Sequence, residues 1–331
     1  MIDMTQPSAN AKPVESTIAY QPPRLAQANG IELCYDSFGD AHAEPMVMIM
    51  GLGAQMIHWD DEFCREIAAC GFRVIRFDNR DIGLSSKMSG GKPLTIFELA
   101  KLRYLGRPVA APYKLSDMAA DVVGLLDALG IDAAHMVGAS MGGMIAQEVA
   151  IEHPQRVRSL VSIMSTTGNP RLPQPGRAVA AKLLQKQPVT YDEFLARFRQ
   201  TWLFLRVGHF PEDEARDLDR AERTYARGLE PDGVGRQLRA ILASGSRKER
   251  LAAVTAPTLV IHGKVDPLVH PAGGRDTAAS IPGAKLMMID GMGHALPISM
   301  WGQVIDAIAR HARGTAVTTR TGAAAIRSAW R

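Results

Sequence analysis

Short apolar runs alternate with helical patterns along most of the chain. Runs such as 45–50 (PMVMIM) and 72–77 (FRVIRF) are typical of buried strands. Further strands are expected at 134–137, 157–164, 258–261 and 285–289. Helices are expected at 63–69, 116–129, 141–152 and 300–312. Apolar strands that alternate with helices predict an α/β protein whose parallel sheet is covered on both faces.

The two ends of the chain depart from this pattern. Residues 1–22 are polar with scattered prolines, and we expect them to be disordered because they offer little apolar surface to bury. Ordered structure is expected to begin near Arg24, with an extended pair of segments that turn at Asn29-Gly30. Residues 314–331 are small, polar and basic, so we expect a flexible tail.

One long internal stretch, 165–250, contains no convincing buried strand. It shows helical patterns at 191–205 and 212–226, broken by Pro188, Pro211 and Pro231. We interpret it as a helical insertion over the sheet. The core domain would then be built from two segments, 23–164 and 251–313.

Composition narrows the possible functions. The chain has 331 residues, of which 46% are hydrophobic, enough for a substantial core. Its net charge of +4 is small, and no Lys/Arg cluster alternates with aromatics, so no nucleic-acid partner is expected. Three cysteines, Cys34, Cys64 and Cys70, fit no zinc pattern and read as reduced thiols. Without a signal peptide or a membrane-spanning run, a soluble cytoplasmic protein is expected.

A candidate nucleophile lies between a predicted strand and a predicted helix. Gly138-Ala139-Ser140-Met141-Gly142 fits the pattern G-x-S-x-G, follows the strand AAHMV and opens the helix that starts at Met141. A sharp turn there would strain Ser140 and expose its hydroxyl, while Gly138 and Gly142 would let strand and helix approach closely. The pattern alone is short and common, so the prediction of a nucleophile depends on its position between a strand and a helix.

A serine needs a base, and the base needs an orienting acid. Asp266 follows the strand TLVI, and His294 follows the strand KLMMI, so both lie where parallel sheets place their sites. Asp290 is a rival acid, although it stands only four residues from His294. The rival histidines are His58, His135, His153, His262 and His270.

The same chemistry needs two N–H donors for a developing oxyanion. Gly51 lets the loop after the strand PMVMI bend inward, so that the backbone N–H of Leu52 can face the site. The backbone N–H of Met141 would supply the second donor. No His/Cys/Asp cluster has metal-ligand spacing, so we expect neither a metal nor a cofactor.

These motifs together resemble the α/β-hydrolase superfamily from about Arg24 to Ala312. The segment 77–85 (FDNRDIGLS) is similar to the family's D-x-R-G-x-G-x-S loop, with Asp81 in place of the usual glycine. In that loop Asp78 and Arg80 would be structural. The segments MGLGAQMIHW, SMGGMIAQEVA and SIMSTTGNP resemble the group that includes aclacinomycin methylesterase, although Met50 replaces the family's usual histidine.

The resemblance implies a fold and a function. The fold would be an α/β-hydrolase fold: a mostly parallel, eight-stranded sheet flanked by helices, with an inserted helical cap at 165–250. Trp202, Phe204 and Phe210 of that cap are the candidates to line the substrate pocket, and the alternative is that they hold the cap together. The activity would be hydrolysis of a carboxylic ester or lactone of a small to medium apolar substrate through an acyl-enzyme.

Other functions remain open on the same residues. Carbon–carbon bond hydrolysis and cofactor-free haloperoxidase activity use a similar triad. A ligand-binding receptor on a hydrolase scaffold is an alternative of another class. The sequence indicates a small-molecule partner and leaves the oligomeric state open.

Overall fold

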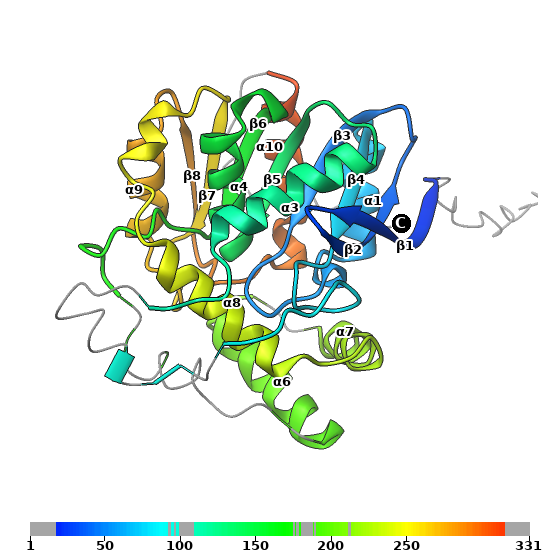
Figure 1. Cartoon of the computed structure of the whole chain (residues 1–331), viewed down its shortest axis with the longest axis vertical. Helices are drawn as coiled ribbons and strands as arrows, with labels where there is room; N and C mark the ends of the chain where they lie inside the picture. The colour runs from blue at the N-terminus through cyan, green and yellow to red at the C-terminus, as the bar shows by residue number, and fades with distance from the viewer. Residues whose placement is uncertain are drawn as a thin grey trace, which may run out of the picture.

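One sheet of eight strands forms the centre of the molecule (Figure 1). The computed structural model describes residues 18–91, 94, 95, 97, 98, 109–174, 176, 179, 188, 190–210 and 213–314. The strands are β1 (Tyr20–Ala28), β2 (Ile31–Phe38), β3 (Glu44–Ile49), β4 (Phe72–Phe77), β5 (Ala134–Ala139), β6 (Val157–Ile163), β7 (Thr258–Gly263) and β8 (Lys285–Ile289). Their order is β1-β2-β4-β3-β5-β6-β7-β8. Strands β3 to β8 run parallel, and β1 and β2 are antiparallel to their neighbours. This arrangement confirms the prediction of a mostly parallel sheet.

The first strand begins earlier than the sequence indicated. It starts at Tyr20 rather than near Arg24, so residues 20–22 belong to the sheet and not to a disordered segment. The Tyr20 ring packs on Phe38 with ring centroids 4.8 Å apart, and its hydroxyl donates to Asp36 at 3.1 Å. This aromatic anchor holds a strand whose composition looked too polar to pack.

Helices cover both faces of the sheet. The core helices are α1 (Asp61–Ala69), α3 (Leu115–Ala128), α4 (Met141–Glu152), α9 (Ala272–Ser280) and α10 (Trp301–Ala312). Short 3₁₀ helices connect them at η1 (Met56–His58), η2 (Pro154–Arg156), η3 (Arg250–Ala253) and η4 (Ile298–Met300). None of the described helices is long and apolar enough to cross a membrane.

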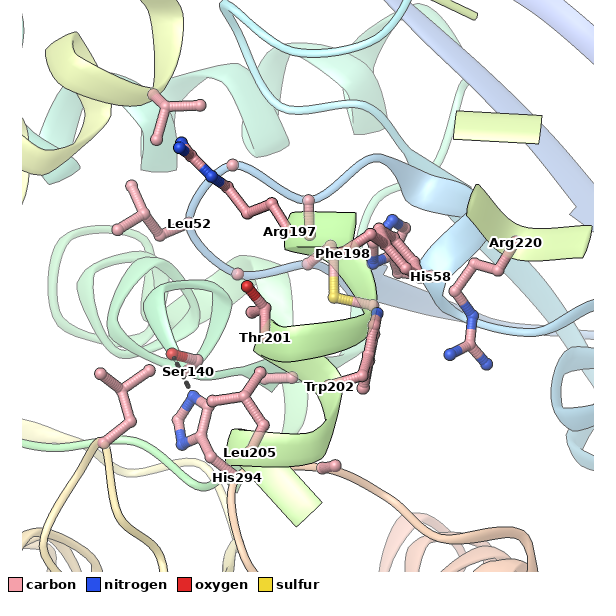
Figure 2. A pocket seen from close by; sticks show the side chains of 18 of the residues that line it. Leu52, His58, Ser140, Arg197, Phe198, Thr201, Trp202, Leu205, Arg220 and His294 are labelled. Carbon is pink, nitrogen blue, oxygen red and sulfur yellow. Dashed lines mark hydrogen bonds between the residues drawn. The ribbon is translucent and has the colours of Figure 1, made fainter. Parts of the chain in front are cut away.

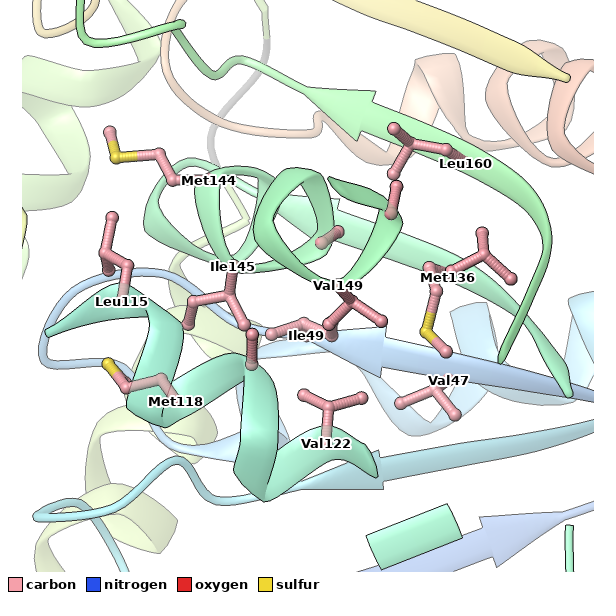
Figure 3. Close-up of a cluster of buried hydrophobic side chains, with 14 of the residues drawn as sticks. Val47, Ile49, Leu115, Met118, Val122, Met136, Met144, Ile145, Val149 and Leu160 are labelled. Atoms are coloured by element: carbon pink, nitrogen blue, oxygen red, sulfur yellow. The ribbon is translucent and has the colours of Figure 1, made fainter. Parts of the chain in front are cut away.

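The strands place alternate side chains in two separate cores. Val47 and Ile49 of β3 pack with α3 and α4 on one face, where Figure 3 shows them beside Val122 and Val149. Met46 and Met48 of the same strand pack toward α1 and α10 on the other face. Each fully buried aliphatic side chain of this kind contributes about 1.5–3 kcal/mol. Packing on both faces therefore fixes the strands whose C-terminal ends carry the candidate site.

A group of helices lies between β6 and β7 in the chain and confirms the inserted helical cap. These cap helices are α6 (Tyr191–Arg206), α7 (Glu214–Ala226) and α8 (Pro231–Ser244). They lie together below the sheet in Figure 1, beyond the C-terminal ends of the parallel strands. The division of the chain at 164/165 and 250/251 stays a prediction.

Arginines of α7, α8 and the turn after α7 fasten the cap to carboxylates of the core. The pairs are Arg216–Glu62, Arg220–Asp60, Arg223–Asp61, Arg227–Asp78 and Arg236–Asp81. Asp78 and Asp81 are wholly buried, so removing the arginine opposite either one would leave an uncompensated buried charge, which costs about 3–5 kcal/mol. The predicted structural role of Asp78 agrees with these contacts, and Arg80 pairs similarly with Asp121 of α3. The cap is therefore tied to the loops that surround the candidate site.

Candidate active site

Ser140 occupies a tight turn between β5 and α4. Its φ of 55° and ψ of −118° lie in a region that costs a residue other than glycine roughly 1–3 kcal/mol. A Cβ atom on Gly138 would lie 2.1 Å from the Gly142 carbonyl oxygen, and one on Gly142 would lie 2.0 Å from the Ile49 carbonyl oxygen. Only glycine therefore fits at either position. The strain at Ser140 is held by the packed strand and helix on either side.

Ser140, His294 and Asp266 form a continuous line of hydrogen bonds. His294 Nε2 lies 2.9 Å from Ser140 Oγ, the contact drawn as a dashed line in Figure 2. His294 Nδ1 lies 2.7 Å from Asp266 Oδ2. Because the carboxylate can only accept, Nδ1 carries the hydrogen, and Nε2 of the neutral ring accepts from the serine hydroxyl. The arrangement can remove the serine proton and hold the resulting imidazolium.

Asp266 is held in its ionised form. Its Oδ1 accepts from the backbone N–H groups of Leu268 and Val269 at 2.9 and 2.8 Å, and His262 Nε2 lies 3.4 Å from its Oδ2. Burial raises the pKa of Asp266, but interaction with His294 and the hydrogen bonds from both histidines outweigh it and hold the pKa well below its usual range. The carboxylate is thus fixed in place and charged.

The rival acid Asp290 and the rival histidines His262 and His135 make other contacts and do not hydrogen-bond to Ser140. Asp290 pairs with Lys264 at 2.7 Å, and its side chain is 86% exposed, so it faces solvent. His262 lies 2.9 Å from the Val269 carbonyl oxygen, and His135 lies 2.8 Å from a serine of the neighbouring strand. Among the described residues, His294 is the histidine that hydrogen-bonds to Ser140.

The loop after β3 runs directly beside Ser140. A Cβ atom on Gly51 would lie 3.2 Å from the Ser140 Cβ, so the backbone here approaches the serine closely. Neither the Leu52 N–H nor the Met141 N–H has an acceptor within the described part of the chain. Met141 is also the first residue of α4, where the helix dipole favours negative charge. Both amides are therefore available to an oxygen bound at Ser140.

A cavity of about 2190 Å³ separates the cap from the sheet edge. Ser140, His294 and Leu52 line its floor, and Thr201 and Leu205 of α6 extend toward the serine and histidine from above (Figure 2). The walls also carry arginines and carboxylates such as Arg220 and Asp60. Ligand pockets are commonly 300–1,000 Å³, so this cavity can take a bulky molecule.

Two of the three predicted pocket aromatics line this cavity. Trp202 and Phe204 are part of its wall. Phe210 is not: it packs against the core, and its ring lies 3.7 Å from where a Cβ on Gly291 would be. The prediction for Phe210 fails because α6 ends at Arg206, so the chain has already turned down toward the sheet.

Sequence reasoning missed several residues of the site. Thr201 and Leu205 stand four positions apart on α6, a spacing that puts both on one helix face with Trp202 beside them. The sequence contains that spacing, but it does not indicate which face of α6 lines the cavity. His58 of η1 was considered only as a rival base, whereas it lines the cavity.

Within the described ranges, no group of three or more His, Cys, Asp or Glu side chains is arranged to hold a metal ion.

Comparison with known proteins places the chain in a family. The profile described as alpha/beta hydrolase fold matches residues 44–299, so the chain belongs to the α/β-hydrolase family. Rhodomycin D methylesterase DauP of Streptomyces sp. (strain C5) is 30% identical over 317 residues, covering 89% of this chain and 100% of that protein. DnrP of Streptomyces peucetius, also a rhodomycin D methylesterase, gives the same identity and coverage. The crystal structure of a hydrolase from Pseudomonas aeruginosa PA01 is similar, with 26% identity, a TM-score of 0.63 and coverage of 91% of this chain and 100% of that one.

Proposed function

We propose that this protein is a serine hydrolase that cleaves a carboxylic ester through an acyl-enzyme intermediate. The observation that carries the proposal is the hydrogen-bonded line from Ser140 through His294 to Asp266, which ends in the cavity. The strained turn at Ser140 and the two free amides beside it support the same chemistry.

The first half of the reaction acylates Ser140. His294 Nε2 takes the hydroxyl proton as Ser140 Oγ attacks the ester carbonyl, and the new imidazolium is stabilised by the Asp266 carboxylate. The carbonyl oxygen becomes an oxyanion between the N–H groups of Leu52 and Met141, where the loss of one donor costs about 3–4 kcal/mol of transition-state stabilisation. Collapse of this intermediate releases the alcohol, which takes its proton from His294.

The second half returns the enzyme to its starting state. Water gives a proton to His294 and attacks the acyl carbon, and the same two amides hold the second oxyanion. Collapse releases the carboxylic acid and returns the proton to Ser140. Neither half needs a metal or a cofactor.

The size of the cavity favours a bulky substrate. We propose an ester with a large, partly aromatic acyl part, because the cavity exceeds what a small ester would fill and Trp202 and Phe204 line it. The two Streptomyces relatives are named methylesterases, which makes a methyl ester the first substrate to test. The proposed substrate is therefore larger than the small to medium ester expected from the sequence.

The proposal is tested with purified wild-type protein and Ser140→Ala. Both are assayed on methyl esters of aromatic acids, aryl esters, a lactone and a vinylogous diketone. Wild-type protein should hydrolyse the esters, and the variant should lose on the order of a millionfold in turnover with an unchanged melting temperature. Ester turnover near the wild-type rate in Ser140→Ala would reject the assignment, and turnover of the diketone alone would favour carbon–carbon bond hydrolysis.

A further inference from the structure

His58 lines the same cavity on the side away from the reacting serine. It belongs to η1, just beyond the loop that carries Leu52, and Figure 2 shows it apart from Ser140 and His294, near Trp202 and Phe198. No step of the proposed hydrolysis uses it. The residue is half-buried and borders the cavity.

The structure fixes which ring nitrogen of His58 carries the hydrogen. His58 Nε2 lies 3.1 Å from Thr224 Oγ1 on α7. The Thr224 hydroxyl donates its own hydrogen to the Arg220 carbonyl oxygen at 2.7 Å, one helical turn earlier. The hydroxyl can therefore only accept from His58, so Nε2 is the donor and Nδ1 is left with a lone pair.

The ring stays neutral at physiological pH. Burial, aided by the charge of Arg220, lowers the pKa of His58 to about 3. Nδ1 has no hydrogen-bond partner in the described part of the chain. The polar side-chain atoms there that are fully buried without a partner do not include His58 Nδ1. An acceptor without a protein partner thus belongs to a residue that lines the cavity.

Aromatic surfaces frame this acceptor. The rings of Phe198 and Trp202 lie 5.9 and 6.0 Å from the His58 ring, centroid to centroid. Arg220 lies over the Trp202 ring at 4.8 Å and is paired with Asp60. A flat ring system bound along these surfaces would bring its edge to His58.

We propose that His58 Nδ1 is a specificity-determining acceptor that selects substrates with a hydroxyl or N–H donor on the acyl part, remote from the ester. The proposal rests on the proposed ester hydrolysis for its substrate class. A site built around a buried acceptor discriminates against an analogue that lacks the donor, because the acceptor is then left without a partner.

The test uses methyl naphthoates that carry one hydroxyl on the ring distant from the ester, each paired with its methoxy analogue. Several hydroxyl positions are compared, so that one of them meets Nδ1. For wild-type protein, kcat/KM should favour at least one hydroxyl ester by roughly tenfold or more over its methoxy partner. His58→Phe should bring that ratio close to one, and His58→Gln, whose amide can donate to Thr224 and accept from the substrate, should restore part of it.

Thr224→Val provides a second variant that leaves the imidazole in place. It removes the acceptor of the Nε2 hydrogen, so either ring nitrogen can carry the proton, and the preference for hydroxyl esters should weaken. A ratio that is the same in wild-type protein and His58→Phe would overturn the proposal.

Calorimetric binding of the same ester pairs to Ser140→Ala separates this proposal from the hydrolase assignment. A hydroxyl preference that disappears on adding His58→Phe supports the His58 proposal even if wild-type protein hydrolyses none of the esters. Hydrolysis without any preference would sink the role of His58 and leave the hydrolase assignment intact.

Discussion

The side chain of Gln237 on cap helix α8 accepts a hydrogen bond from the backbone N–H of Gly53 at 2.9 Å. Its amide nitrogen donates to the Arg80 carbonyl oxygen, also at 2.9 Å. Gln237 is wholly buried. One side chain therefore joins the cap to the loop that carries Leu52, so the position of that loop depends on a docked cap.

Replacing Gln237 with Leu should lower kcat for ester hydrolysis by roughly tenfold or more, with a smaller change in KM. The variant leaves the Gly53 N–H and the Arg80 carbonyl without partners, which costs about 1–3 kcal/mol and releases the loop. Steady-state kinetics and thermal unfolding measure the two effects. Val122→Ala on α3 is the control, because it also weakens the fold but lies in the core away from the loop. An equal loss of kcat in both variants would attribute the effect to stability.

The glycines of the elbow give a second prediction. Gly142→Ala should destabilise the protein severely or prevent its folding, because the new methyl would lie 2.0 Å from the Ile49 carbonyl oxygen. Gly302→Ala is the matched control, because Gly302 lies in α10 with nothing within 4 Å of the added carbon. The free energy of unfolding of this variant should rise by about 0.5–1 kcal/mol. Urea unfolding compares the two. A Gly142→Ala protein as stable as wild type would contradict the close approach of strand and helix.

Local patterns explain why much of the site could be predicted from the sequence. Ser140, Asp266 and His294 each follow an apolar strand, and a parallel sheet brings such loops to one edge, where the structure places them within hydrogen-bond distance. Their catalytic roles stay predictions. The family and the mostly parallel sheet are confirmed.

Residues that depend on how the cap docks could not be predicted in the same way. Gln237 reaches Gly53 across 184 positions, and Thr224 reaches His58 across 166. No local spacing encodes such contacts, because they depend on the packing of α7 and α8. Phe210 could not be placed for the same reason. An aromatic side chain is typical of a pocket wall, but Phe210 lies beyond the end of α6 and packs against the core.

The orienting acid is tested by comparing two aspartates. Asp266→Asn should keep the fold and lose on the order of ten-thousandfold in kcat, the effect of the comparable change in a serine protease, because the amide can present the wrong partner to His294. Asp290→Asn is the control, since Asp290 is exposed and pairs with Lys264, and the kcat of this variant should stay near that of wild type. Kinetics on one ester measure both. If Asp266→Asn kept more than about a tenth of the wild-type activity, another group would have to orient His294.

The lowered pKa of His58 predicts a pH-dependent loss of stability. In the unfolded chain the ring titrates near 6.5, whereas burial in the folded protein lowers its pKa to about 3. Between these values the unfolded chain binds a proton that the folded protein does not, so the free energy of unfolding falls as the pH falls from about 6.5 toward 3. The slope from this one group is at most about 1.4 kcal/mol per pH unit.

His58→Phe removes that term while other titrating groups remain. The advantage of wild-type protein over His58→Phe in unfolding free energy should therefore shrink as the pH is lowered from 7 toward 4.5, and it can reverse sign. Urea unfolding of both proteins across this range measures the difference, in which the shared carboxylates and the other buried histidines cancel. A difference that stays constant with pH would mean that His58 binds its proton equally in the folded and unfolded states. The folded ring would then be charged in acid, and Nδ1 would be a donor there rather than an acceptor.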